Sequence, residues 1–160
     1  MAKAAPGYDS IGSALVRTGK KEWINAGDGN QFLVLRISKE TGAWSALVKA
    51  PAGQVNAPHT HIGPADFYVL SGGFDYRGGS ARAGDWVYEA AGTVHEATTH
   101  PMDTVYLANV YGPVAFHDGK GGFAGILDWR AVQAMVDKAK QKKKVAAPVT
   151  AAKGGKKKAA

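Results

Sequence analysis

The chain has 160 residues, 45% of them hydrophobic and 21% charged, and its 21 glycines exceed the usual share, which favours a single all-β domain with many tight turns. The absence of cysteine excludes a disulfide framework and a thiolate metal site, so any metal must be held by His, Asp or Glu. No apolar run approaches the roughly 18 residues of a membrane span. Because the start MAKAAPGYDS also lacks the apolar stretch of a secretory signal, we expect a cytoplasmic protein.

The formal net charge of +7 is carried by one end of the chain. Residues 136–160 contain nine Lys and one Asp, whereas residues 1–135 contain 11 basic and 12 acidic residues. The globular part is therefore nearly neutral, and we expect no specific nucleic-acid partner. The lysine-rich end has almost no apolar bulk to bury, so residues 145–160 are expected to be a disordered, solubilising tail. Loose, salt-sensitive attraction of this tail to nucleic acid or anionic surfaces is the alternative.

Short β-prone segments dominate the rest of the chain. Residues 1–20 are mixed in character and are expected to form an N-terminal arm. Two strands are expected at 31–38 and 43–50, joined by the turn-forming sequence KETG. The further segments, mostly separated by glycine or proline, are 59–62, 66–71, 73–77, 85–90, 94–99, 104–111 and 114–117. So many short strands predict a sandwich or barrel over residues 21–127 rather than alternating strands and helices.

One helix is expected after the strands, over residues 128–144. Asp128 is a favourable N-cap, and lysines crowd the C-terminal turns of the segment. Apolar residues recur at helical spacing, namely Trp129, Val132, Met135 and Val136. The helix is expected to pack on the outside of the barrel.

A pair of histidines offers the first sign of a metal site. His59 and His61 are two residues apart in a segment expected to be a strand, so both imidazoles project to the same side. Such a pair is half of a metal site, but a surface pair of no function explains it equally well when it is considered alone. His100 and His117 are expected to be exposed or internally hydrogen-bonded rather than ligands.

The sequence around the pair resembles the two motifs of the cupin superfamily. The first motif corresponds to GQVNAPHTHIGPADFYVLSGG, which contains both histidines, and the second to GDWVYEAAGTVH, which ends at His95. The resemblance implies a cupin jelly-roll β-barrel in which His59, His61 and His95 meet and hold one divalent metal ion. A cupin barrel whose histidines bind only adventitious metal is the alternative.

Asp66 stands where the family has a glutamate ligand. Its side chain is one methylene shorter, so its carboxylate should fall short of a bond of about 2.0–2.2 Å to the metal. We therefore expect an open three-histidine site completed by water, in which Asp66 has a catalytic, orienting role; direct ligation by Asp66 is the alternative. Tyr68 shares the face of Asp66 by strand alternation and is expected to line the cavity as a second catalytic residue, with plain core packing as the alternative.

Among cupins, the chain is similar to the small single-domain subgroup containing 2,4'-dihydroxyacetophenone dioxygenase, acetylacetone-cleaving dioxygenase and the cupin domain of certain anti-sigma factors. The likeness lies in WSALVKAPAG, FYVLSGGFDYRGG and GPVAFHDGKGGFAGILDW. It implies an Fe(II)-dependent dioxygenase that cleaves a carbon–carbon bond of a small β-diketone or hydroxyketone. The metals Zn, Ni and Mn remain open.

Two other functions stay open at this point. One is a zinc-binding sensor or regulatory cupin without catalysis, and the other is a metal-assisted isomerase or hydrolase. For either enzyme the partner is a small-molecule substrate, joined by dioxygen in the dioxygenase, and no membrane is involved. A homodimer formed through edge strands is expected in every case.

Overall fold

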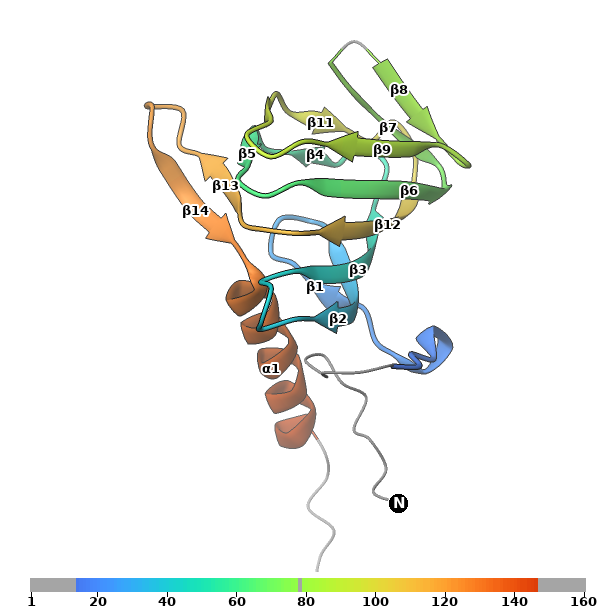
Figure 1. Cartoon of the computed structure of the whole chain (residues 1–160). Helices are drawn as coiled ribbons and strands as arrows, with labels where there is room; N and C mark the ends of the chain where they lie inside the picture. Colours follow the sequence, from blue (N-terminus) through green and yellow to red (C-terminus); the bar gives the residue numbers. More distant parts are fainter. Residues whose placement is uncertain (1–13, 78, 147–160) are drawn as a thin grey trace, which may run out of the picture.

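The computed structural model describes residues 14–77 and 79–146, with side chains up to Lys143 (Figure 1). Most of the expected N-terminal arm and the expected tail from residue 147 on lie outside these described residues. A short 3-10 helix, η1 (Thr18–Lys20), precedes the first strand. The described chain is otherwise an arrangement of antiparallel sheets with one terminal helix, which confirms the expected all-β cupin jelly roll.

A six-stranded sheet forms one wall of the molecule. Its strand order is β1 (Ile24–Asn25), β2 (Gln31–Ile37), β3 (Trp44–Ala50), β12 (Thr104–Val110), β6 (Ala65–Ser71) and β9 (Trp86–Glu89). Alternate residues of β3 and β12 are buried, and they lie opposite each other in pairs such as Ala46 with Ala108 and Val48 with Tyr106. This period of two places one face of the sheet in the core.

Two four-stranded sheets complete the barrel. One has the order β10 (Val94–His95), β5 (His59–His61), β13 (Val114–His117) and β14 (Phe123–Leu127). The other has the order β4 (Val55–Asn56), β11 (Thr98–Thr99), β7 (Gly73–Tyr76) and β8 (Gly79–Arg82). Both smaller sheets pack on the inner face of the large one. Val114 of β13 belongs to the same hydrophobic core as Trp44 and Val110, and the ring of Phe74 of β7 packs on that of Tyr106 of β12.

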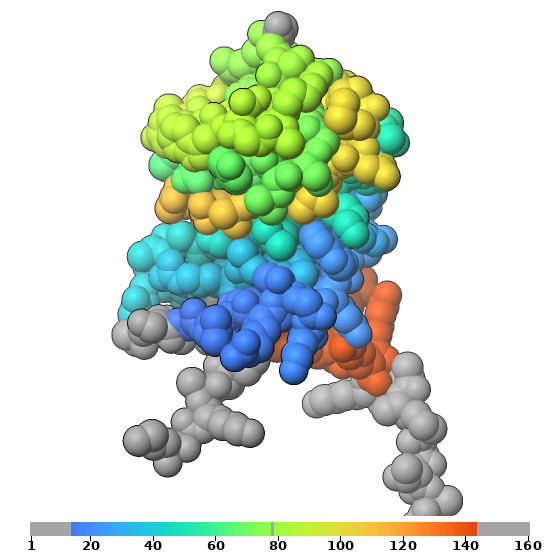
Figure 2. Space-filling model, turned by 90° about the vertical axis from the view of Figure 1, so that its right-hand side faces the viewer, coloured from blue at the N-terminus to red at the C-terminus, as the bar shows by residue number. Residues whose placement is uncertain are grey.

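Helix α1 (Trp129–Ala146) lies at the end of the barrel formed by β1, β2 and β14 (Figure 1). Asp128 caps it, because the backbone N–H groups of Arg130 and Ala131 both donate to Asp128 Oδ1 at 2.9 Å. Val132 and Val136 are fully buried in the main core. In the space-filling view, the helix and the N-terminal segment form one end of the molecule, opposite the segment from β7 to β9 (Figure 2). No helix of the described residues is long and apolar enough to span a membrane.

Two connections between the sheets touch at a pair of glycines. Gly63 lies between β5 and β6, and Gly112 lies between β12 and β13. A Cβ atom added at either glycine would run into the backbone of the other. The two chain segments can therefore cross this closely only because both positions lack a side chain.

Candidate metal centre

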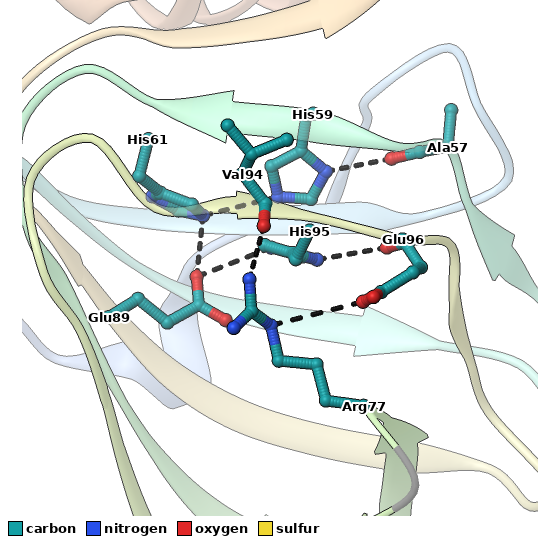
Figure 3. Close-up of polar contacts among 8 residues, drawn as sticks. All are labelled: Ala57, His59, His61, Arg77, Glu89, Val94, His95 and Glu96. Atoms are coloured by element: carbon teal, nitrogen blue, oxygen red, sulfur yellow. Dashed lines mark hydrogen bonds and ion pairs between the residues drawn. The ribbon is translucent and has the colours of Figure 1, made fainter.

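Four buried side chains converge inside the barrel (Figure 3). His59 and His61 lie on the inner face of β5, and His95 of β10 pairs directly with His59. Glu89 ends β9, the edge strand of the six-stranded sheet. One potential ligand atom from each of the four residues lies within 4.8 Å of all the others, so the group can hold a metal ion.

The donor atoms face one another at short range. His59 Nε2 lies 3.1 Å from His61 Nε2, and Glu89 Oε2 lies 2.6 Å from His61 Nε2 and 3.3 Å from His95 Nε2. Lone pairs this close repel each other unless a proton or a cation lies between them. Three imidazoles and one carboxylate form a donor set that suits Fe, Zn or Ni, so the residues present fit a divalent metal.

Backbone carbonyls orient two of the imidazoles. His59 Nδ1 donates to the carbonyl of Ala57 at 2.7 Å, and His95 Nδ1 donates to the carbonyl of Glu96 at 2.9 Å. Because a carbonyl oxygen can only accept, the proton of each neutral ring lies on Nδ1 and the Nε2 lone pair points into the cluster. Metal-binding histidines are commonly held in this way.

Burial and mutual contact set the charges of the group. Burial lowers the pKa of His59 to about 4, so this ring is neutral and free to ligate at neutral pH. Burial would raise the pKa of Glu89, but its contacts with His61 and His95 outweigh burial and hold that pKa well below its usual range. Burial alone would lower the pKa of His95, but the hydrogen bond and the negative charge of Glu89 together outweigh burial, so the pKa of His95 is raised. Glu89 is therefore ionised among the imidazoles.

The cluster opens on a cavity of about 100 Å³ inside the barrel. Its walls are mainly apolar and include Val48, Phe67, Phe74, Val110 and Phe116. Phe116 of β13 packs on the ring of His59, with 5.4 Å between ring centroids. Since one water molecule needs only about 10–15 Å³ of such space, the cavity suits a small molecule.

Asp66 and Tyr68 lie outside this site. Asp66 Oδ1 accepts from Asn109 Nδ2, and Asp66 Oδ2 accepts from the Tyr111 hydroxyl, each at 2.8 Å. Tyr68 is 43% exposed on the same outer face of β6, whereas Phe67 faces the cavity. The expected cavity-facing positions of Asp66 and Tyr68 are therefore corrected. The chain changes sheets between β5 and β6, so the alternation that starts at His61 does not continue to residue 66.

Glu89 occupies the position that was expected for Asp66, and it was not expected from the sequence. The segment WVYE alternates, with Val87 and Glu89 facing inward and Trp86 and Tyr88 exposed. A single acidic residue on the inward side of a strand, just before the turn that leads to His95, was the signal that could have identified it. His117 is hydrogen-bonded to the Thr60 hydroxyl at 2.8 Å on the outer side of β5.

Arg77 supports the backbone next to the cluster (Figure 3). Its guanidinium donates to the carbonyl of Val94, the residue that precedes His95, and lies 3.8 Å from the carboxylate of Glu96. Both partners flank His95, so Arg77 positions the β10 segment rather than binding in the cluster.

The chain is similar to proteins of a known family and to proteins of known structure. Residues 12–115 match the family described as the ChrR cupin-like domain. The acetylacetone-cleaving enzyme of Acinetobacter johnsonii is 30% identical over 111 residues, which cover 66% of this chain and 72% of that enzyme. A proposed acetylacetone dioxygenase from Methylibium petroleiphilum PM1 has a similar crystal structure, with a TM-score of 0.73 at 27% identity, covering 79% of this chain and 95% of that one.

A complex that contains an anti-sigma factor is also similar. The crystal structure of Rhodobacter sphaeroides SigE in complex with the anti-sigma factor ChrR matches with a TM-score of 0.51 at 26% identity. This match covers 59% of the chain described here and 50% of the other chain.

Proposed function

The chain belongs to the ChrR cupin-like domain family, and we propose that it is a metal-dependent dioxygenase that cleaves a carbon–carbon bond in a small β-diketone or hydroxyketone. The observation that carries the proposal is the buried group of three histidines and Glu89 on the wall of a small, mainly apolar cavity. The 30% identity with an enzyme that cleaves acetylacetone, a β-diketone, supports the substrate class.

The metal proposed for this group is one Fe(II) ion, held by His59, His61, His95 and Glu89. When bound, such an ion polarises the oxygen atoms of a chelating substrate and brings dioxygen next to it. The same donor set also accepts Zn, Ni or Mn, so the identity of the metal belongs to the proposal.

The protein itself contributes orientation and a dry environment. The carbonyls of Ala57 and Glu96 hold the rings of His59 and His95, so both Nε2 atoms keep a constant direction. Phe67 and Phe116 line the cavity beside His61 and His59 and exclude water from a bound substrate. A chelating substrate would thus be held flat against aromatic walls with its oxygens toward the histidines.

Oxygen consumption tests the proposal directly. Protein loaded with Fe(II) under anaerobic conditions and then mixed with pentane-2,4-dione and air should consume one dioxygen per diketone. The products should be two fragments whose atoms sum to those of the diketone and one dioxygen. The control is the variant His59→Ala/His61→Ala/His95→Ala, which should bind no stoichiometric metal and consume no oxygen.

A regulatory cupin is the second candidate function. The observation in its favour is Glu89, because three imidazoles and a carboxylate can complete a closed tetrahedral zinc site. The resemblance to the ChrR structure also supports a regulatory role. Tight zinc retention, together with no oxygen uptake by the iron-loaded protein on β-diketones or hydroxyketones, would favour this role over the dioxygenase.

A further inference from the structure

A second set of polar side chains lines the same cavity as the metal centre. It consists of Asn30, Asn56, His100 and Tyr106, here called the distal polar group. His100 and Asn30 are 1% and 3% exposed, so water outside the barrel does not reach them. Two of their polar atoms, His100 Nε2 and Asn30 Oδ1, are buried without a hydrogen-bond partner among the described residues.

The hydrogen bonds of Asn30 show which way its amide points. Asn30 Nδ2 donates to Asp28 Oδ2 at 2.9 Å and to Asn56 Oδ1 at 2.8 Å. A carboxylate oxygen only accepts, so the NH₂ end of the amide faces Asp28. Asn30 Oδ1 therefore points away from Asp28 as a free acceptor.

The ring of His100 also presents an acceptor. His100 Nδ1 donates to the carbonyl of Gln54 at 3.3 Å, which leaves Nε2 without a proton in the neutral ring. Burial lowers the pKa of His100 and keeps the ring neutral. Tyr106 stacks on the ring with 6.2 Å between centroids, and Phe74 packs beside it at 5.9 Å, so the direction of Nε2 is constrained.

A series of ring contacts connects the metal centre with the distal polar group. The ring of Phe67 lies 6.1 Å from that of His61 and 5.9 Å from that of Tyr106. The ring of Tyr106 in turn contacts that of His100, which is not a member of the group that can hold a metal. The cavity thus carries two groups of polar side chains, and Phe67 and Phe74 are among the apolar residues of its wall.

We propose that the distal polar group binds a hydroxyl group of the substrate, whose O–H donates to His100 Nε2 or Asn30 Oδ1. The inference rests on the proposed function, because it takes the other end of the same molecule to be the oxygen pair held at the metal. The substrate class narrows to β-diketones or hydroxyketones with a hydroxyl group at the end away from the metal. A methyl group in that place leaves both acceptors unpaired, so the site discriminates against it.

Two matched ligands test the inference on the native protein. Anaerobic Fe(II)-loaded protein is titrated in a calorimeter with hexane-2,4-dione and with 6-hydroxyhexane-2,4-dione, which differ by one terminal hydroxyl. The hydroxylated diketone should bind at least ~10-fold more tightly, equivalent to about 1.4 kcal/mol. This comparison needs no variant, so it remains available if a substitution prevents folding.

Two variants then assign the preference to His100. His100→Phe keeps an aromatic ring beside Phe74 and Tyr106 but removes the acceptor, so the ratio of the two diketone affinities in this variant should fall below ~2-fold. His100→Gln retains an acceptor and should keep part of the preference. Metal content and melting temperature are measured for both variants, to confirm that each is folded and loaded.

The outcomes separate the inference from the proposed function. If both diketones bind with equal affinity, or if His100→Phe is folded and loaded and keeps the full preference, the inference is overturned and the dioxygenase proposal stands. If neither diketone binds to the iron-loaded native protein, the proposed function fails and the inference fails with it.

Discussion

At the scale of single residues, Glu89 distinguishes this centre from a site of three histidines alone. Its carboxylate is 5% exposed and lies 2.6 Å from His61 Nε2. A buried carboxylate adds a negative charge next to a bound cation in a medium that screens charge poorly. Glu89 should therefore strengthen the binding of a divalent ion well beyond what the imidazoles achieve.

The variant Glu89→Gln tests this contribution. Glutamine has nearly the same shape but no charge, so we expect the affinity for Zn(II) or Fe(II) to fall at least ~10-fold. Competition with a chelator of known affinity measures the change. The matched control is Asp66→Asn, whose side chain faces Asn109 and Tyr111 and should leave metal affinity unaltered. Equal affinity in native protein and Glu89→Gln, or a large loss in Asp66→Asn, would contradict this assignment.

The histidines and the carboxylate differ in how far the sequence could predict them. His59 and His61 share one strand, so simple alternation predicts that they face the same way, and the structure brings both to His95. To predict that Glu89 supplies the carboxylate, one would need its position relative to the histidines across a turn at which the chain changes sheets. Strand alternation carries no information across such a turn. Their role as metal ligands stays a prediction.

At the scale of elements, the start of α1 depends on one side chain. Asp128 accepts two backbone N–H groups of the first turn, and the helix buries Val132 and Val136 against the barrel. We expect Asp128→Ala to lower the free energy of unfolding by about 1 kcal/mol, whereas Asp128→Asn should retain most of it, because the amide oxygen can still accept. Urea denaturation measures both, and an unchanged midpoint in Asp128→Ala would contradict the capping role.

Acid should weaken the same cap. Burial would raise the pKa of Asp128, but hydrogen bonds from Ala131 and Arg130 prevail and lower it from the ordinary value of 3.8. A carboxyl whose pKa is lowered by folding stabilises the fold above 3.8, and this contribution is lost as the pH falls through the lowered pKa. The stability difference between native protein and Asp128→Ala should therefore shrink below about pH 4. A difference that is constant from pH 7 to pH 2.5 would show that the charge of Asp128 is irrelevant.

Long alternating strands and the helix were predictable, and short strands were not. The expected segments 43–50 and 104–111 appear as β3 and β12, because seven residues of buried alternation leave little ambiguity. The single strand expected at 94–99 is instead β10 and β11, which belong to different sheets. Segments such as β8, with the sequence GSAR, become strands through their partners rather than through intrinsic preference.

At the scale of the whole molecule, the outer face of the six-stranded sheet carries exposed aromatic and aliphatic side chains. Trp86 and Tyr88 of the edge strand β9 stack at 6.0 Å and are 61% and 54% exposed, beside Tyr68 and Leu70 of β6. An edge strand with such a surface suits pairing with a second copy of the chain. The expected homodimer is accordingly proposed to form through this face.

Light scattering tests the dimer. The native protein should show twice the mass of one chain, and Trp86→Lys should raise the dimer dissociation constant at least ~10-fold. Ile126→Lys is the control, because Ile126 is equally exposed, on β14, and should leave the mass unchanged. A monomeric native protein at micromolar concentration would contradict the proposal.

The crossing of Gly63 and Gly112 has a consequence for anyone who wishes to redesign this cavity. His61 lies two residues before Gly63, and its strand partner Val114 lies two residues after Gly112. A methyl group added at either glycine would force the connections apart and carry that displacement along β5 and β13 into the imidazoles. Mutant libraries that aim at new substrates should therefore vary the aromatic walls and spare these two positions, although neither belongs to the group that can hold a metal.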